Sequence, residues 1–115
     1  MDLKLVKGDY LLEAGRVRTA AGAEAVLQRV QLALATRRGS FLAKPEFGSR
    51  LHLLLREKPS AREALAFALV QEALAGEREL ILEQATLSES GGGSVTLTVR
   101  LRWRGEGLTA THLVQ

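Results

Sequence analysis

RRGSFLAKPEFGSRLHLLLRE, residues 37–57, separates two helical patterns and carries the most distinctive residues of the chain. Gly39 follows a run that ends in two arginines, a position where glycine often takes the left-handed conformation that ends a helix. Pro45 then fixes one backbone angle, Phe47 supplies a large apolar anchor, and Gly48 permits a second sharp turn. We therefore predict that this segment is an ordered connection that holds the two helices together.

Helical periodicity continues on both sides of these turns. Leu51, Leu54 and Leu55 are spaced as on one side of a helix, which predicts a short and partly buried helical turn. Before the segment, the pattern predicts a helix from Ala23 to Thr36. Its apolar stripe consists of Ala23, Val26, Leu27, Val30, Ala33 and Leu34.

A second principal helix is predicted after residue 57. Ser60 and Glu63 have the S-x-x-E spacing of a capping box directly after Pro59, and Gly76 is the predicted stop. The stripe that this helix would bury consists of Leu65, Ala66, Leu69, Val70, Ala73 and Leu74.

The last third of the chain alternates with a period of two, which is typical of strands. We predict strands over residues 80–88, 94–104 and 108–114, with a hairpin loop at Ser90–Gly93 and a turn at Gly105–Gly107. In the middle strand, Val95, Leu97, Val99, Leu101 and Trp103 would face the core. These strands would form a three-stranded antiparallel meander with one apolar face.

The first residues suggest a further β-structure. Leu3 and Leu5 alternate with Lys4 and Val6, and turn signals follow at Gly8-Asp9 and at Gly15, before Val17. The overall prediction is one α+β domain over residues 1–115, with an N-terminal β-hairpin and two principal helices packed on a C-terminal three-stranded antiparallel sheet.

Composition narrows the classes of protein to consider. The 115 residues are 46% hydrophobic and 25% charged, and no apolar run is long enough to span a membrane. The sequence opens with no signal peptide, so we expect a cytosolic protein. The absence of cysteine excludes disulfides, thiolate metal sites and cysteine nucleophiles. The net charge of +3 arises from 16 basic and 13 acidic residues spread along the chain, which suits an acidic protein partner as well as a nucleic acid.

Catalytic and metal-binding patterns are weak. Glu46 and Glu57 could act as the acid and base of a glycosidase, but no other catalytic motif accompanies them. His52 and His112 lack the spacing of a metal site, so we read both as structural. No phosphate-binding glycine motif precedes a helix. We expect no enzyme activity, no metal, no cofactor and no small-molecule substrate.

The arginines of the middle strand are a candidate binding surface. The period of two places Arg100, Arg102 and Arg104 in a row on the outer face of the sheet. Such a row could bind phosphates or an acidic partner, but no aromatic residues are interleaved to stack on bases. A nucleic-acid-binding module is therefore an alternative that we rank below a solvated sheet face.

Several segments resemble a known family. Thr36-Arg37-Arg38-Gly39 and Pro45-Glu46-Phe47-Gly48-Ser49-Arg50-Leu51 together form a T-x-R-G and P-x-x-G-x-x-L pair, and residues 8–12 and 24–30 add to the likeness. The chain resembles the small baseplate-wedge proteins of contractile phage tails, including the phage Mu type and the related sheath-initiating baseplate subunit of type VI secretion systems. Many members carry Glu-Pro-Arg where this chain reads Glu77-Arg78-Glu79, without the proline.

The resemblance implies a structural, non-enzymatic role in a virion tail baseplate, after assembly in the cytoplasm of the bacterial host. The particle would be a phage, a prophage or a tailocin. The implied partners are other wedge proteins and the tail sheath protein. We expect no membrane partner, and we rank a nucleic-acid partner below these proteins. The alternatives are a basic nucleic-acid-binding module and a lysozyme-like glycosidase. The charged residues that we expect to contact partners are Arg37, Arg38, Glu46, Arg50, Glu77, Arg78, Arg100, Arg102 and Arg104.

Overall fold

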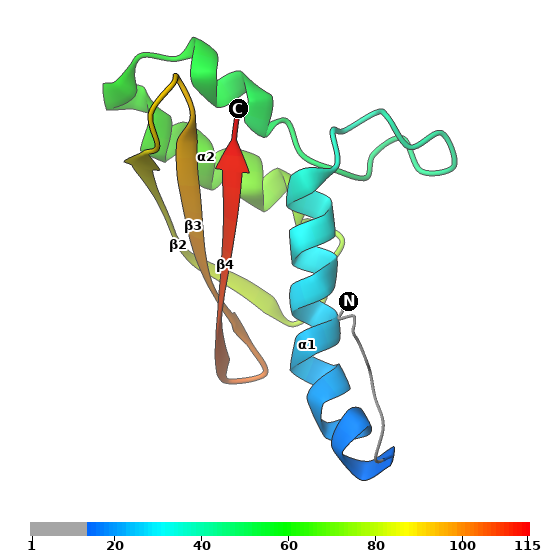
Figure 1. Cartoon of the computed structure of the whole chain (residues 1–115). Coiled ribbons are helices and arrows are strands. Elements are labelled where there is room, and N and C mark those ends of the chain that lie inside the picture. The colour runs from blue at the N-terminus through cyan, green and yellow to red at the C-terminus, as the bar shows by residue number, and fades with distance from the viewer. Residues whose placement is uncertain (1–13) are drawn as a thin grey trace.

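The computed structural model of the chain describes residues 14–115, with side chains from residue 22 onward. Two α-helices, a short 3-10 helix and three strands follow one another along the chain (Figure 1). They are α1 (Ala14–Ala35), η1 (Leu51–Arg56), α2 (Pro59–Ala73), β2 (Leu80–Glu89), β3 (Val95–Trp103) and β4 (Glu106–Val114). The predicted α+β class, with two principal helices and a C-terminal antiparallel sheet, is confirmed.

The sheet has the order β2-β3-β4, and both pairings are antiparallel. One face of β3 is fully buried, because Val95, Leu97, Val99 and Leu101 each expose at most 2% of their surface. On that face α1 lies closest to β4 and α2 lies closest to β2. The core is therefore a single layer of side chains between the helices and the sheet.

The helical stripes are buried as their spacing predicts. Val26, Val30, Ala33 and Leu34 of α1 are buried, and so are Ala66, Leu69, Val70 and Leu74 at α2. Among the described residues, no helix is long and apolar enough to cross a membrane.

The predicted N-terminal β-hairpin requires correction. Residues 1–13, which include Tyr10, lie outside the described part of the chain. The turn predicted at Gly15 is wrong, because α1 begins at Ala14 and runs through Gly15 and Val17. The run contains alanines and arginines, which favour helix strongly, and the few alternating positions around Val17 did not outweigh them.

The start of α2 also differs from the capping box predicted at Ser60 and Glu63. The helix begins at Pro59, and its N-cap is Lys58 in an extended conformation without a side-chain cap hydrogen bond. A proline at the first helical position favours this start, and it keeps the residue before it extended. The Glu63 carboxylate accepts a hydrogen bond from the Leu87 backbone N–H at 3.3 Å and so connects α2 to β2.

The turn between β3 and β4 is tighter than predicted. Trp103 pairs with Glu106, so the loop consists of Arg104 and Gly105 alone rather than Gly105–Gly107. Both residues have positive φ, at 50° and 82°, as a two-residue type I′ hairpin turn requires. β4 therefore begins at Glu106, two residues before the predicted start.

Trp103 ends β3 where the sheet meets α1. Its indole is half-buried and packs against the core, as its place in the apolar series predicts. A β-carbon on Gly22 of α1 would stand 3.4 Å from the Trp103 ring, so the glycine lets the helix pass close to the indole. Trp103 therefore joins α1 to the end of the sheet.

Candidate functional site

Residues 36–38 and 48–49 form a clasp that closes the long connection between α1 and η1. The Arg38 backbone N–H donates to the Ser49 carbonyl at 2.9 Å, and the Ser49 N–H donates to the Thr36 carbonyl at 2.8 Å. Arg37 and Ser49 thereby form an isolated parallel β-bridge. The predicted ordered connection is confirmed, and η1 supplies the predicted helical turn after it.

The clasp also caps the carboxyl end of α1. The Ser49 hydroxyl is buried and donates to the Leu34 carbonyl at 2.8 Å, so it satisfies one of the carbonyls that the end of a helix leaves unpaired. Gly48 has φ of 108°, and a β-carbon there would stand 2.7 Å from the Thr36 carbonyl oxygen. The two segments of the clasp, residues 36–38 and 48–49, can therefore approach each other this closely only because residue 48 is glycine.

A loop extends from the clasp. Residues 39–47 leave α1 and the sheet and return to the clasp, as Figure 1 shows. Phe47 packs partly against the core, and its ring meets that of Phe41 edge to face with centroids 6.1 Å apart. Leu42 next to this pair is 90% exposed.

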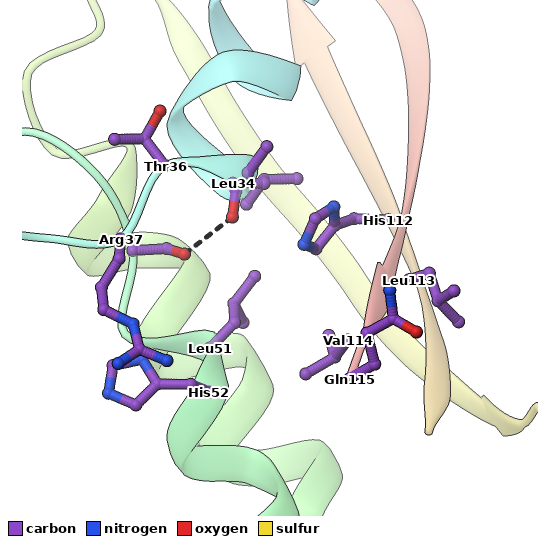
Figure 2. Close-up of a pocket in the computed structure, with 11 residues that line it drawn as sticks. Leu34, Thr36, Arg37, Leu51, His52, His112, Leu113, Val114 and Gln115 are labelled. Carbon is purple, nitrogen blue, oxygen red and sulfur yellow. Dashed lines mark hydrogen bonds between the residues drawn. The ribbon is translucent and has the colours of Figure 1, made fainter. Parts of the chain in front are cut away.

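A pocket of about 140 Å³ lies between the clasp and the end of β4. Its lining comes from the end of α1, from Ser49, from Leu51 and His52 at the start of η1, and from residues 112–115 (Figure 2). Figure 2 shows Arg37 and His52 on one side of the pocket and His112 on the other. Segments that are distant in sequence thus place three basic side chains around one hollow.

The two histidines have different electrostatic surroundings. Partial burial lowers the pKa of His52, and the nearby positive charges of Arg37, Arg56 and Arg50 lower it further. Partial burial alone lowers the pKa of His112. Both imidazoles are therefore neutral at pH 7, and each can donate one N–H and accept one hydrogen bond.

Four of the nine residues predicted to contact partners form ion pairs inside the chain. Arg50 binds Glu72 of α2 through two hydrogen bonds of 2.9 and 3.1 Å. Glu77 accepts from Arg29 of α1 at 3.0 to 3.2 Å, in the segment where the resembling family has its proline. Arg102 donates to Glu83 at 2.8 Å, and Arg104 donates to Glu79 at 2.6 Å.

The other five predicted residues, Arg37, Arg38, Glu46, Arg78 and Arg100, form no ion pair within residues 22–115. Arg37, Glu46, Arg78 and Arg100 are exposed, and Arg38 is half-buried. Their charges face solvent over three regions: the clasp and its loop, the entry to β2, and the outer face of β3.

The predicted row of three arginines is shorter in the structure. Arg100 and Arg102 lie on the outer face of β3, but Arg104 lies beyond the strand in the β3–β4 turn, where its guanidinium packs over the Trp103 ring. Positive φ at Arg104 breaks the alternation that the prediction assumed. Arg100 is consequently the member of the row whose charge has no ion-pair partner in the described part of the chain.

The described residues contain no group of three side chains that could hold a metal ion. Glu46 lies in the exposed loop, and Glu57 is the exposed residue that ends η1. Neither carboxylate forms a side-chain hydrogen bond with the described part of the chain. Both carboxylates are therefore exposed to solvent.

The pocket was missed from the sequence because its parts are far apart. His52 and His112 are the two histidines of the chain, and no spacing rule connects them. The available signal was that His112 has the same parity in β4 as the buried Ala110 and Val114, so it had to point toward the helices. The position of His52 on the opposite side of the pocket depends on the clasp.

No protein-family model and no curated protein matches the sequence. The fold is similar to the crystal structure of a candidate tail lysozyme from Geobacter sulfurreducens, with a TM-score of 0.69. The superposition covers 94% of this chain and 97% of that chain, at 20% sequence identity. At this identity the comparison shows a shared fold over nearly the whole length of both chains.

Proposed function

We propose that this protein is a structural component of the baseplate of a contractile phage tail or phage-tail-like particle. It assembles with other wedge proteins and provides a platform on which the tail sheath begins to form. The role is binding, without catalysis, in a virion tail or in a particle derived from one.

The observation that carries this proposal is the clasp. The T-x-R-G half and the P-x-x-G-x-x-L half of the resembling motif meet there, since Ser49 N–H binds the Thr36 carbonyl and Gly48 permits the approach. The motif is thus one folded unit, in a fold shared with a candidate tail lysozyme. Both findings support a protein of phage-tail type.

The sheet suggests how partners would bind. β2 and β4 are its edge strands, and each carries backbone N–H and C=O groups on the side away from β3. A strand from a partner can add to such an edge by β-augmentation, with specificity from side chains around it. We propose β4 as the edge that receives a sheath or wedge segment, with Arg37 and Arg100 as charged contacts.

The test is incorporation into particles. The protein is expressed together with the wedge and sheath proteins encoded beside its gene, and assembled particles are purified and analysed by mass spectrometry. We expect the protein in the particles at a fixed ratio to the wedge proteins. Particles that assemble without it, with no co-purification of any wedge protein, would refute the proposal.

Charge reversals locate the contact surface. Arg37→Glu and Arg100→Glu should lower incorporation, because both side chains are exposed and form no ion pair with the described residues. Arg37→Lys and Arg100→Lys are the matched controls. Both keep the positive charge and should be incorporated normally if the partner binds that charge. Arg50→Glu is unsuitable as a docking probe because it would place a carboxylate against Glu72.

A glycosidase is a second candidate, because the structurally similar protein is described as a tail lysozyme. If this chain hydrolyses peptidoglycan through Glu46, the purified protein should clear a cell-wall suspension, and Glu46→Gln should abolish clearing. We expect no clearing by either protein. Turnover that is lost in Glu46→Gln would replace the structural role with an enzymatic one.

A further inference from the structure

The pocket beside the clasp has the size of a site for one small group. Its volume of about 140 Å³ is below the roughly 300 Å³ at which pockets for whole cofactors or drug-sized ligands begin. His52 lies on one side of it and the end of β4 on the other (Figure 2). A single side chain, the end of a peptide or a small organic acid would fit.

The pocket lining has positive charge at Arg37 and no acidic side chain. His52 and His112 also line the pocket, and because their imidazoles are neutral at pH 7, they contribute N–H donors rather than charge. Arg56 adds positive charge near His52, whereas the nearby charge of Arg50 is paired with Glu72. The potential in the pocket therefore favours an anion and disfavours a cation.

These three side chains also lack hydrogen-bond partners among residues 22–115. In contrast, the guanidinium groups of Arg29, Arg50 and Arg102 each bind a carboxylate in the same part of the chain. The pocket thus gathers N–H donors that the rest of the described fold does not use. A guanidinium and an imidazole N–H are the donors that proteins commonly direct at a carboxylate.

The remaining lining is largely apolar. Leu34, Leu51 and Val114 are all buried core residues whose side chains reach the pocket. Ser49 contributes little polarity, because its hydroxyl already donates to the Leu34 carbonyl. An occupant with an apolar part next to its charge would therefore match the pocket better than an inorganic anion.

We propose that this pocket binds a carboxylate attached to an apolar group, with Arg37 and the two imidazoles around the charge and with Leu34, Leu51 and Val114 against the apolar part. The two sources of this chemistry are the carboxyl end of a polypeptide chain and a free small carboxylic acid. The pocket shares Arg37 and residues 112–114 of β4 with the proposed partner-binding edge. Binding of a small carboxylate is nevertheless measured on the isolated protein, so its outcome does not depend on the tail assignment.

The experiment uses nuclear magnetic resonance of the full chain at pH 7 with defined probes. N-acetyl-L-leucine carries both the apolar group and the carboxylate of a chain end, whereas N-acetyl-L-leucinamide lacks the charge. Acetate represents the free acid. We expect saturable shifts of the His52 and His112 ring signals and of the backbone amides at 113–115 with N-acetyl-L-leucine, and none with the amide.

Substitutions then show which side chains bind the carboxylate. Arg37→Gln should raise the dissociation constant of N-acetyl-L-leucine about tenfold, as expected for the loss of one hydrogen bond to a charged group. His112→Gln should weaken binding as well. Arg78→Gln, an exposed arginine outside the pocket lining, is the matched control and should leave the constant within about twofold.

The outcomes separate clearly. Tighter binding of N-acetyl-L-leucine than of acetate supports a chain end as occupant, and equal binding supports a free acid. No saturable shift with either carboxylate, or equal shifts with the amide, overturns the proposal. The comparison of acid and amide on the unsubstituted protein decides the question even if a variant fails to fold.

Discussion

The close backbone contact in the clasp depends on a single residue, Gly48. Gly48 and Gly39 were both predicted from the sequence as turn glycines, and both have positive φ, at 108° and 91°. Their surroundings differ, however. A β-carbon at Gly48 would meet the backbone of Thr36 and Arg38, whereas a β-carbon at Gly39 would meet nothing within 4 Å.

This difference predicts unequal costs for the same substitution. Gly39→Ala should lower the free energy of unfolding by about 1–2 kcal/mol, the usual cost of a left-handed backbone for a residue with a side chain. Gly48→Ala should cost clearly more, because the clasp must also open to admit the methyl group. Urea denaturation of both variants measures the difference. Equal losses would mean that the close approach does not contribute to stability.

The Arg50–Glu72 pair predicts a pH dependence. The hydrogen bond from Arg50 lowers the pKa of the Glu72 carboxyl below its ordinary 4.5. A lowered pKa in the folded protein means that the pair stabilises the fold above that ordinary value and stops doing so as the pH falls through the folded value. Glu72→Gln should therefore lower the urea midpoint slightly at pH 7 and leave it unchanged near pH 2. A difference that persists near pH 2 would have another cause.

Residue chemistry predicts conformation better than it predicts partners. The positive φ of Gly39 can be predicted from its position after a helix, and that of Gly48 from its position after Phe47. The partner of Arg50 could not be predicted, because Glu72 lies in a different helix and the two meet only after α2 packs on η1. Some charged residues that the sequence analysis assigned to partner contacts therefore form ion pairs within the folded chain instead.

At the scale of elements, buried stripes set which helices and strands form, while turns set where they end. The stripes of α1 and α2 and the alternation of β3 were all predicted from the sequence. The start of α2 at Pro59 and the turn at Arg104–Gly105 were not. Arg104 carries a side chain at positive φ, and nothing in an arginine indicates this, whereas an asparagine there would have done.

The packing of α2 predicts a large effect at its centre. Leu69 exposes 3% of its surface, so Leu69→Ala should lower the free energy of unfolding by about 2–5 kcal/mol. Leu32→Ala in α1 is the matched control, since Leu32 is 59% exposed, and it should change stability by no more than about 0.5 kcal/mol. Thermal or urea melts compare the two. A Leu69→Ala protein as stable as Leu32→Ala would disprove the central position of Leu69.

At the scale of the whole molecule, the α+β class followed from the order of periodicities, because a 3.6-residue period changes to a period of two after Gly76. The pocket did not follow, because it combines α1, η1 and β4 and depends on the clasp to set their distances. The helices and the sheet share one common core.

Because one core joins all described elements, the domain should unfold in a single transition. Trp103, the sole tryptophan, packs between the sheet and Gly22 of α1, so its fluorescence reports their contact. Far-ultraviolet circular dichroism reports the helices. We expect the two signals to give the same urea midpoint. An earlier fluorescence midpoint would show that α1 leaves the sheet before the helices melt.

The unequal turns of the meander bear on the route by which the chain folds. β3 and β4 are joined by two residues that already have the twist of a hairpin, whereas β2 and β3 are joined by Ser90–Ser94, whose three glycines must all be ordered. We therefore expect β3–β4 to be paired in the folding transition state while β2 is still free. Stopped-flow φ-values should be higher for Val114→Ala in β4 than for Leu87→Ala in β2. The reverse order would mean that α2 brings β2 to the sheet first, and that a helix, not a turn, starts the fold.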